Sequence, residues 1–167
     1  MILIGGGSRS GKSSAALRMA AAAGPRVGFI ATAQALDDEM RERIAQHRRE
    51  RAESIVTWEE PLAVPGRIER EAAGLDAIVV DCLTLWVSNL LLADGVYVAN
   101  EYHALVEAAA NAKSAVILVT NEVGCGIVPD NALARRFRDE AGKLNQLCAA
   151  RADEVYWMAF GVSLKLK

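Results

Sequence analysis

Eight residues near the start of the chain have the types and spacing of a phosphate-binding loop. The loop consists of Gly6, Gly7, Ser8, Arg9, Ser10, Gly11, Lys12 and Ser13, and fits the pattern G-x-x-x-x-G-K-[ST]. Its glycines let successive backbone N–H groups converge on an anion, and the helix that follows adds partial positive charge. We expect Lys12 to reach the β- and γ-phosphates of a nucleotide and the Ser13 hydroxyl to bind Mg²⁺. Arg9 is either a further cation near the phosphates or a solvated side chain.

Two acidic residues follow apolar runs that read as strands. Asp81 ends the run Ala77–Val80, at the position where a parallel strand presents its residues to a ligand crevice. Asp81 is either a carboxylate that holds the Mg²⁺ water shell or the N-cap of a helix over Cys82–Leu92. Glu122 follows Val116–Thr120, and is either a base or water-positioning group or an ion-pair partner of the arginines in 135–138.

One of the two histidines is a candidate nucleophile. His47 continues the spacing of Met40 and Ile44 along a predicted helix over Asp37–Arg51, on the face that packs inward. Arginines of the same segment surround it, and cationic neighbours favour the neutral, nucleophilic imidazole. From the residues alone, His47 is either this nucleophile or a helix histidine at the margin of the core. His103 lies in an alanine-rich stretch and is predicted to be a surface residue.

The elements that position these residues alternate along the chain. Short apolar runs rich in β-branched residues predict strands buried on both faces: Met1–Ile4, Val27–Ala31, Ala77–Val80, Ala115–Thr120 and Val155–Phe160. Helices are predicted over Ser13–Ala23, Asp37–Arg51 and Asn131–Ala150, the last with an apolar stripe of Leu133, Phe137, Leu144, Leu147 and Cys148. Val162–Lys167 alternates and predicts an antiparallel edge strand. The pattern indicates an α/β, three-layer P-loop NTPase-like fold with a mostly parallel sheet.

The composition of the chain limits which classes of protein it can belong to. The 167 residues are 52% hydrophobic and 24% charged, with a formal net charge of −2, which favours one domain over residues 1–167 and excludes a disordered chain. No apolar run approaches the roughly 18 residues of a membrane span, and MILIGGG lacks the basic region of a signal peptide. The charge balance argues against nucleic acid as a partner. The guanine-reading motif N-K-x-D of switch GTPases is absent from the chain.

The three cysteines are odd in number and have no C-x-x-C spacing. This usage is typical of buried thiols in a reducing cytoplasm rather than of a disulfide framework or a zinc site. We therefore expect Cys82, Cys125 and Cys148 all to be buried.

Several motifs, taken in order, resemble one enzyme family. These motifs are the phosphate loop, Ile30-Ala-Thr-Ala33, Asp37-Asp-Glu-Met40, His47-Arg48, Thr57-Trp-Glu-Glu-Pro61, Thr120-Asn-Glu-Val-Gly-Cys-Gly-Ile-Val-Pro129 and Phe137-Arg-Asp-Glu-Ala-Gly-Lys-Leu-Asn-Gln146. Together, from Met1 to Lys167, they resemble the bifunctional adenosylcobinamide kinase/adenosylcobinamide-phosphate guanylyltransferases of cobalamin biosynthesis.

The resemblance implies two reactions. A γ-phosphate passes from GTP or ATP to the aminopropanol hydroxyl of adenosylcobinamide. His47 then attacks the α-phosphorus of GTP and carries GMP to the adenosylcobinamide phosphate. The alternatives from the residues are a P-loop small-molecule kinase without nucleotidyl transfer and a non-catalytic nucleotide-binding module.

The resemblance also implies the site residues and the assembly. Nucleotide contacts are expected from Gly6–Ser13, Ala31, Thr32, Ala33, Arg48, Arg49, Glu50, Arg51, Glu59 and Asp81, with Ser13 and Asp81 also serving Mg²⁺ and Glu122 as an auxiliary residue. A cytoplasmic homotrimer is expected.

Overall fold

The computed structural model describes residues 1–49 and 51–167, with the side chains of all of these except Arg43 and His47. The strands are β1 (Ile2–Gly6), β2 (Val27–Ala31), β3 (Val56–Glu59), β4 (Ala77–Asp81), β5 (Ala115–Val119), β6 (Glu154–Ala159) and β7 (Val162–Lys165). The helices are α1 (Lys12–Ala23), α2 (Asp38–Arg49), α3 (Val64–Glu71), α4 (Leu83–Leu92), α5 (Val98–Asn111) and α6 (Ala132–Arg151), with a short 3₁₀ turn over Ala72–Gly74.

The strands of this described part form one seven-stranded sheet in the order β3-β2-β4-β5-β1-β6-β7. Its neighbours pair in parallel except β6 and β7, which run antiparallel. The strand that leads into the phosphate loop, β1, lies between β5 and β6, and Ile4 pairs with both Val119 and Tyr156. The carboxyl ends of the six parallel strands therefore meet at one edge of the sheet.

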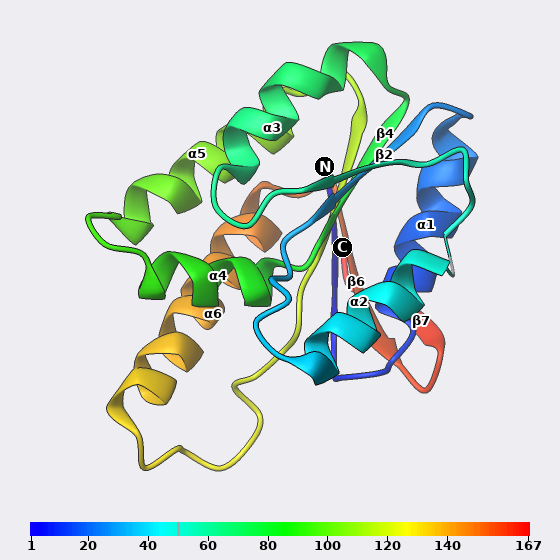
Figure 1. Cartoon of the computed structure of the whole chain (residues 1–167). Helices are drawn as coiled ribbons and strands as arrows, with labels where there is room; N and C mark the ends of the chain where they lie inside the picture. Colours follow the sequence, from blue (N-terminus) through cyan, green and yellow to red (C-terminus); the bar gives the residue numbers. More distant parts are fainter. Residues whose placement is uncertain (50) are drawn as a thin grey trace.

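Helices cover both faces of the sheet, with α1 and α2 on one side and α3, α4, α5 and α6 on the other (Figure 1). Two buried apolar clusters correspond to these two interfaces. The larger one joins the sheet to α3, α4, α5 and α6 and includes the fully buried Trp86 and Leu105. The smaller one joins the sheet to α1 through its alanines. The predicted α/β three-layer fold with an antiparallel C-terminal edge strand is confirmed.

Two elements were not predicted: the edge strand β3 and the helix that follows it, α3. β3 is a four-residue strand whose ends, Val56 and Glu59, are exposed, so it lacks the continuous apolar run of a buried strand. α3 follows directly and has Pro65 in its first turn, a position that proline tolerates because that N–H has no intrahelical partner.

Two expectations about burial were wrong. Cys125 is exposed, in the long loop between β5 and α6, whereas Cys82 and Cys148 are buried as expected. Leu133 is also exposed, because the first turn of α6 extends beyond the helices that cover the rest of it; Leu144 and Cys148, farther along the same stripe, are fully buried.

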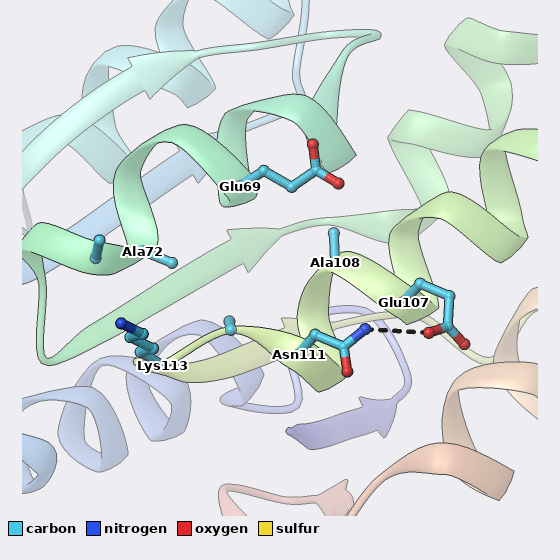
Figure 2. Close-up of a pocket in the computed structure, with 8 residues that line it drawn as sticks. Glu69, Ala72, Glu107, Ala108, Asn111 and Lys113 are labelled. Carbon is cyan, nitrogen blue, oxygen red and sulfur yellow. Dashed lines mark hydrogen bonds between the residues drawn. The ribbon is translucent and has the colours of Figure 1, made fainter.

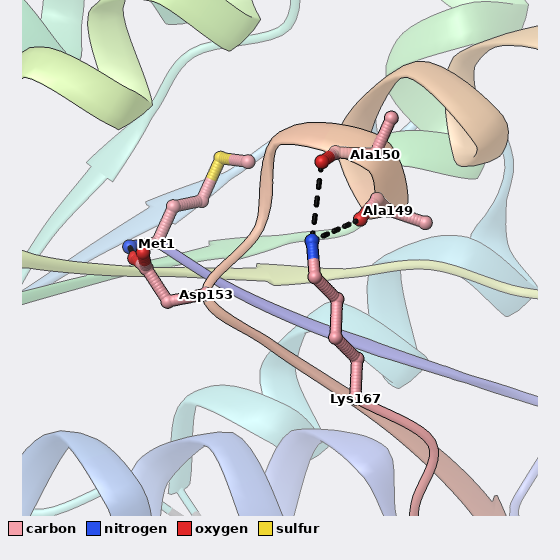
Figure 3. Close-up of polar contacts among 5 residues, drawn as sticks. All are labelled: Met1, Ala149, Ala150, Asp153 and Lys167. Atoms are coloured by element: carbon pink, nitrogen blue, oxygen red, sulfur yellow. Dashed lines mark hydrogen bonds and ion pairs between the residues drawn. The ribbon is translucent and has the colours of Figure 1, made fainter.

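At the edge of the sheet opposite the phosphate loop, both ends of the chain are tied to the segment around the end of α6 (Figure 3). The α-ammonium group of Met1 lies 2.6 Å from Asp153 Oδ2. Lys167 Nζ donates to the carbonyl oxygens of Ala149 and Ala150, at 3.3 and 3.1 Å, where a cation complements the C-terminal end of α6. Across the described residues, no helix combines the length and the apolar character needed to cross a membrane.

Candidate active site

The predicted phosphate loop connects β1 to α1, and two glycines shape it. Gly6 has φ +149°, and a Cβ atom there would lie 2.4 Å from the carbonyl oxygen of Met158 on the neighbouring strand. Gly11, with φ +94°, is the N-cap residue of α1. Any side chain at Gly6 would therefore force the loop away from β6, and both positions use backbone angles that favour glycine.

Lys12 is held over this loop by hydrogen bonds to two of its residues. Its side chain is almost fully buried, and Nζ donates to the carbonyl oxygen of Gly7 at 2.5 Å and to Ser10 Oγ at 3.4 Å. Burial lowers the pKa of Lys12, and the nearby carboxylate of Asp81 acts in the opposite direction. The loop thus presents a cation, converging backbone groups and the N-terminus of a twelve-residue helix to an anion.

Asp81 is the last residue of β4 and is half-buried at the carboxyl edge of the sheet. Its charge raises the pKa of both Lys12 and Arg51, which opposes the effect of burial on each of them. The alternative role of Asp81 as a helix N-cap is wrong, because the N-cap of α4 is Cys82.

The oxygen donors at this place fit Mg²⁺. The hydroxyl of Ser13, in the first turn of α1, and the carboxylate of Asp81 are ligands of the kind Mg²⁺ prefers, and at phosphate sites the ion takes one or two protein ligands while phosphates and water supply the rest. Within residues 1–49 and 51–167, no group of three or more His, Cys, Asp and Glu side chains gathers around a single point.

The end of β2 is tied to β4 by a buried hydroxyl. Thr32 Oγ1 donates to the carbonyl oxygen of Cys82 and accepts its N–H, both at 2.8 Å. Ala31 pairs with Asp81 across the two strands, and Ala31 and Ala33 are partly exposed. The side chain and both backbone polar groups of Thr32 are therefore engaged within the protein, since its N–H donates to Asp81 and its carbonyl oxygen accepts from Asn89. The nucleotide contact predicted for Ala31, Thr32 and Ala33 stays a prediction.

The helix that carries His47 follows the carboxyl end of β2, at the same edge of the sheet. Asp37 Oδ1 accepts the N–H of Met40 at 2.7 Å and begins α2, and His47 lies in the last turn of that helix. The side chain of His47 and the whole of Glu50 lie outside the described residues, so the contacts predicted for them stay predictions.

Arg51 attaches the segment after α2 to the sheet. Its guanidinium carbon lies 4.0 Å from the centroid of the Phe29 ring, and Nη1 donates to Thr57 Oγ1 at 3.2 Å. Phe29 and Thr57 are paired residues of β2 and β3, so one cation spans both strands. Burial lowers the pKa of Arg51, and the carboxylate of Asp81 again opposes that effect.

A hollow of about 500 Å³ lies beside α2. Its lining residues are Ala35, Arg41, Ile44, Ala45, Arg48, Arg49 and Glu59. Arg48 Nη2 lies 3.6 Å from Glu59 Oε1, which joins the helix to the end of β3, and Arg49 is exposed. Three of the residues predicted to bind nucleotide thus line one cationic hollow next to the last turn of α2.

A second hollow, of about 300 Å³, lies between α3 and α5 (Figure 2). Asn111 donates to Glu107 at its rim. The hollow lies where Ala72–Gly74 and Lys113 lead into β4 and β5, at the amino ends of those strands. It is therefore at the opposite edge of the sheet from the phosphate loop and contains none of the predicted site residues.

Glu122 lies beside the phosphate loop and is held by the turn that follows it. Its N–H donates to the carbonyl oxygen of Gly6 at 3.2 Å, and its Oε1 accepts the N–H of Gly124 at 2.5 Å. Arg138 Nη2 donates to the carbonyl oxygen of that same Gly124 at 2.5 Å. Glu122 and Arg138 thus hold one glycine between them, instead of forming the direct ion pair considered from the sequence.

Several polar residues that support this edge were missed. Thr84 Oγ1 accepts both the N–H of Asn121, at 2.8 Å, and its side-chain amide, at 3.1 Å. Asn89 Nδ2 donates to the carbonyl oxygens of Thr32 and Pro61, at 2.8 and 3.0 Å. The available signal was the presence of Thr84 and Asn89 in the mostly apolar α4, since polar groups removed from water need hydrogen-bond partners.

The family model and the relatives that match this chain all indicate the same family, and each match covers nearly the whole chain. A family model described as cobinamide kinase / cobinamide phosphate guanyltransferase matches residues 2–166. The bifunctional adenosylcobalamin biosynthesis protein CobP of Pseudomonas aeruginosa is 47% identical over 166 residues, which cover 99% of this chain and 96% of the relative. The bifunctional protein CobU of Salmonella typhimurium is 44% identical over 100% of this chain and 99% of the relative, and that of Escherichia coli is 39% identical over the same shares. The chain therefore belongs to the cobinamide kinase / cobinamide phosphate guanyltransferase family.

Proposed function

We propose that this chain catalyses both reactions named for its family. It phosphorylates the aminopropanol hydroxyl of adenosylcobinamide with GTP or ATP, and it then transfers GMP from GTP to give adenosylcobinamide-GDP. One observation carries the proposal: the carboxyl ends of the parallel strands β1, β2 and β4 lie at one edge of the sheet, and from these ends follow the phosphate loop, the helix that bears His47, and Asp81.

In the kinase step, Gly6–Ser13 bind the phosphates of the donor. Lys12 moves from its loop partners to the β- and γ-phosphates and neutralises charge that develops during transfer. Ser13 and Asp81 would hold Mg²⁺, which supplies further neutralisation of the phosphate charge when bound. The attacking group is the hydroxyl oxygen of the corrinoid side chain, which displaces the nucleoside diphosphate at the γ-phosphorus.

In the transfer step, a neutral ring nitrogen of His47 attacks the α-phosphorus of GTP. A P–N bond forms, the bond to the bridging oxygen breaks, and pyrophosphate leaves. An oxygen of adenosylcobinamide phosphate then attacks the same phosphorus, and His47 is released. Arg48, Arg49, Glu50, Arg51 and Glu59 contact the nucleotide in this step, and Glu122 is an auxiliary residue beside the loop.

We also propose that the chain works as a homotrimer in the cytoplasm. The resemblance to the family supports this assembly, and sedimentation velocity at micromolar concentration measures it directly.

Labelling with GTP that carries ³²P at the α-phosphorus tests the proposal. We expect the wild-type chain to acquire an acid-labile, alkali-stable label, and His47→Asn to acquire none. His103→Asn is the matched control, because His103 is exposed on α5 and should leave labelling unchanged.

The competing functions give other outcomes in the same experiment. A small-molecule kinase without nucleotidyl transfer would release ADP or GDP with cobinamide but acquire no label. A nucleotide-binding module would show neither turnover nor label. Retention of the label in His47→Asn would remove His47 from its proposed role.

A further inference from the structure

Phe160 is a fully exposed aromatic residue with an uncommon backbone conformation. It follows β6, in the turn to β7, and its side chain has no burial at all. Its φ is +54°, in the left-handed region that residues with a Cβ rarely adopt. Residues held in such conformations cluster at ligand and active sites, so the turn is a candidate for function.

This turn is attached to the phosphate loop. The N–H of Gly161 donates to the carbonyl oxygen of Ser10 at 3.1 Å. A Cβ atom on Gly11 would lie 3.4 Å from Gly161 Cα, and one on Gly6 would meet the carbonyl oxygen of Met158. The turn between β6 and β7 thus lies beside the blue loop that leads into α1 (Figure 1), and the hydrogen bond holds the backbone next to Phe160 at that loop.

The strand order indicates on which side of β1 the terminal phosphate and the nucleoside of a bound nucleotide would lie. β5 and β4 lie on one side of β1, and β6 and β7 lie on the other. Asp81 ends β4, and Glu122 follows β5, so both carboxylates lie on the first side. With Mg²⁺ held by Asp81 and Ser13, the terminal phosphate of a kinase donor would point toward the carboxylate side. The nucleoside would then extend to the other side of the loop, toward the turn that carries Phe160.

We propose that Phe160 is the stacking surface for the purine base of the phosphate donor in the kinase step. The inference rests on the proposed kinase function and deepens it. Aromatic rings stack on every base because each has a π-face, whereas selection of one base requires hydrogen bonds to its edge. A single exposed ring therefore accounts for a donor site that takes either GTP or ATP.

Direct binding tests this assignment without relying on turnover. The probes are the non-hydrolysable donor AMP-PNP with Mg²⁺ and inorganic tripolyphosphate with Mg²⁺, which has the same chain of phosphates but no base. AMP-PNP is chosen because the guanylyl-transfer step does not use an adenine nucleotide.

The informative variant is Phe160→Gly, because glycine favours the left-handed conformation and keeps the turn intact. We expect it to weaken AMP-PNP binding about 10-fold, equal to about 1.4 kcal/mol, and to leave tripolyphosphate binding unchanged. Phe160→Tyr should bind AMP-PNP within about twofold of wild type, since stacking on aromatic rings tolerates this change. Val162→Ala is the matched control, an exposed apolar residue two positions farther along the same hairpin.

Two results would overturn the assignment: equal AMP-PNP affinity in wild type and Phe160→Gly, or an equal loss of affinity for both probes. The proposed function fails separately, if wild type binds AMP-PNP but phosphorylates no cobinamide. In that case the ratio of affinities for the two probes still decides the role of Phe160.

Discussion

The guanidinium of Arg51 lies over the ring of Phe29, with 4.0 Å between its central carbon and the ring centroid. Arg51 follows the helix that carries His47, whereas Phe29 is a buried residue of β2. The stacked pair and the hydrogen bond to Thr57 fix the end of the helical segment to the sheet. This attachment lies close to Asp81, because Phe29 is two residues before Ala31, which pairs with Asp81.

This pair predicts an unequal effect on the two reactions. Arg51→Lys keeps the charge but loses the planar stack and the aligned N–H groups. We expect a loss of about 1 kcal/mol, or roughly fivefold, in the rate of guanylyl labelling, and a smaller loss in cobinamide phosphorylation. Quenched-flow labelling and a coupled kinase assay measure the two rates. Arg18→Lys, an exposed arginine of α1, is the control.

Stacking also predicts coupling between the two residues. In a double-mutant cycle with Phe29→Leu and Arg51→Lys, the second change should cost less once the first is made, because the contact is already lost. Strictly additive effects on the labelling rate would show that the contact does not position the segment.

Asp81 and Lys12 predict a pH dependence of phosphate binding. Lys12 is charged at low pH and loses its proton as the pH rises through its pKa, which burial has lowered and Asp81 partly restores. Tripolyphosphate affinity in magnesium-free buffer should therefore fall toward alkaline pH. In Asp81→Asn the fall should begin at a lower pH, because the group that raises the pKa of Lys12 is gone.

Titration calorimetry between pH 7 and 10 follows this change. Lys12→Gln should bind more weakly at neutral pH and show no alkaline fall over that range. An unchanged alkaline fall in Asp81→Asn would mean that the two charges do not act on each other.

Asp76 predicts a pH dependence of stability at the other edge of the sheet. Arg26 donates to both oxygens of this carboxylate, from its backbone N–H at 2.9 Å and from Nη2 at 2.7 Å, and these contacts hold the pKa of Asp76 below its usual range. A lowered folded-state pKa gives stability that is present above the unfolded-state pKa of about 3.9 and is lost as the pH falls through the folded-state value.

Asp76→Asn should therefore lower the midpoint of thermal unfolding at pH 7 by about 3 °C. The difference from wild type should shrink as the pH falls below about 4 and vanish at still lower pH. Asp94→Asn, at an exposed position after α4, is the control. A difference that stays constant down to pH 2 would contradict the assigned cause.

The three cysteines predict a selective thiol reaction. Cys125 is exposed, whereas burial raises the pKa of Cys148 to about 12 and also raises the pKa of Cys82. Only thiolates react quickly with disulfide reagents. At pH 8 we expect one fast equivalent from the folded wild-type chain and three after unfolding, with no fast equivalent in Cys125→Ser. A second fast thiol in the folded chain would contradict the burial of Cys82 and Cys148.

The sequence by itself determined the parts of the molecule that depend on neighbours along the chain. The phosphate loop, its flanking strand and helix, the other buried strands and the antiparallel edge could be predicted, because glycine positions, apolar runs and alternation are properties of short segments. The family could be recognised because its motifs are also short segments of the sequence. The exposed strand β3 lacked such a signal, and so did the helix after it.

Only the tertiary structure decided which residues meet across the sheet. That Asp81 lies beside Ala31, that Arg51 contacts Phe29 and Thr57 of adjoining strands, and that Thr32 hydrogen-bonds with Cys82 all follow from the strand order, with β2 between β3 and β4. The attachment of the Phe160 turn to Ser10 follows from the same order. The strand order depends on how helices pack on both faces of the sheet, which involves segments far apart in the chain. The spacing of residues within one segment therefore does not predict it.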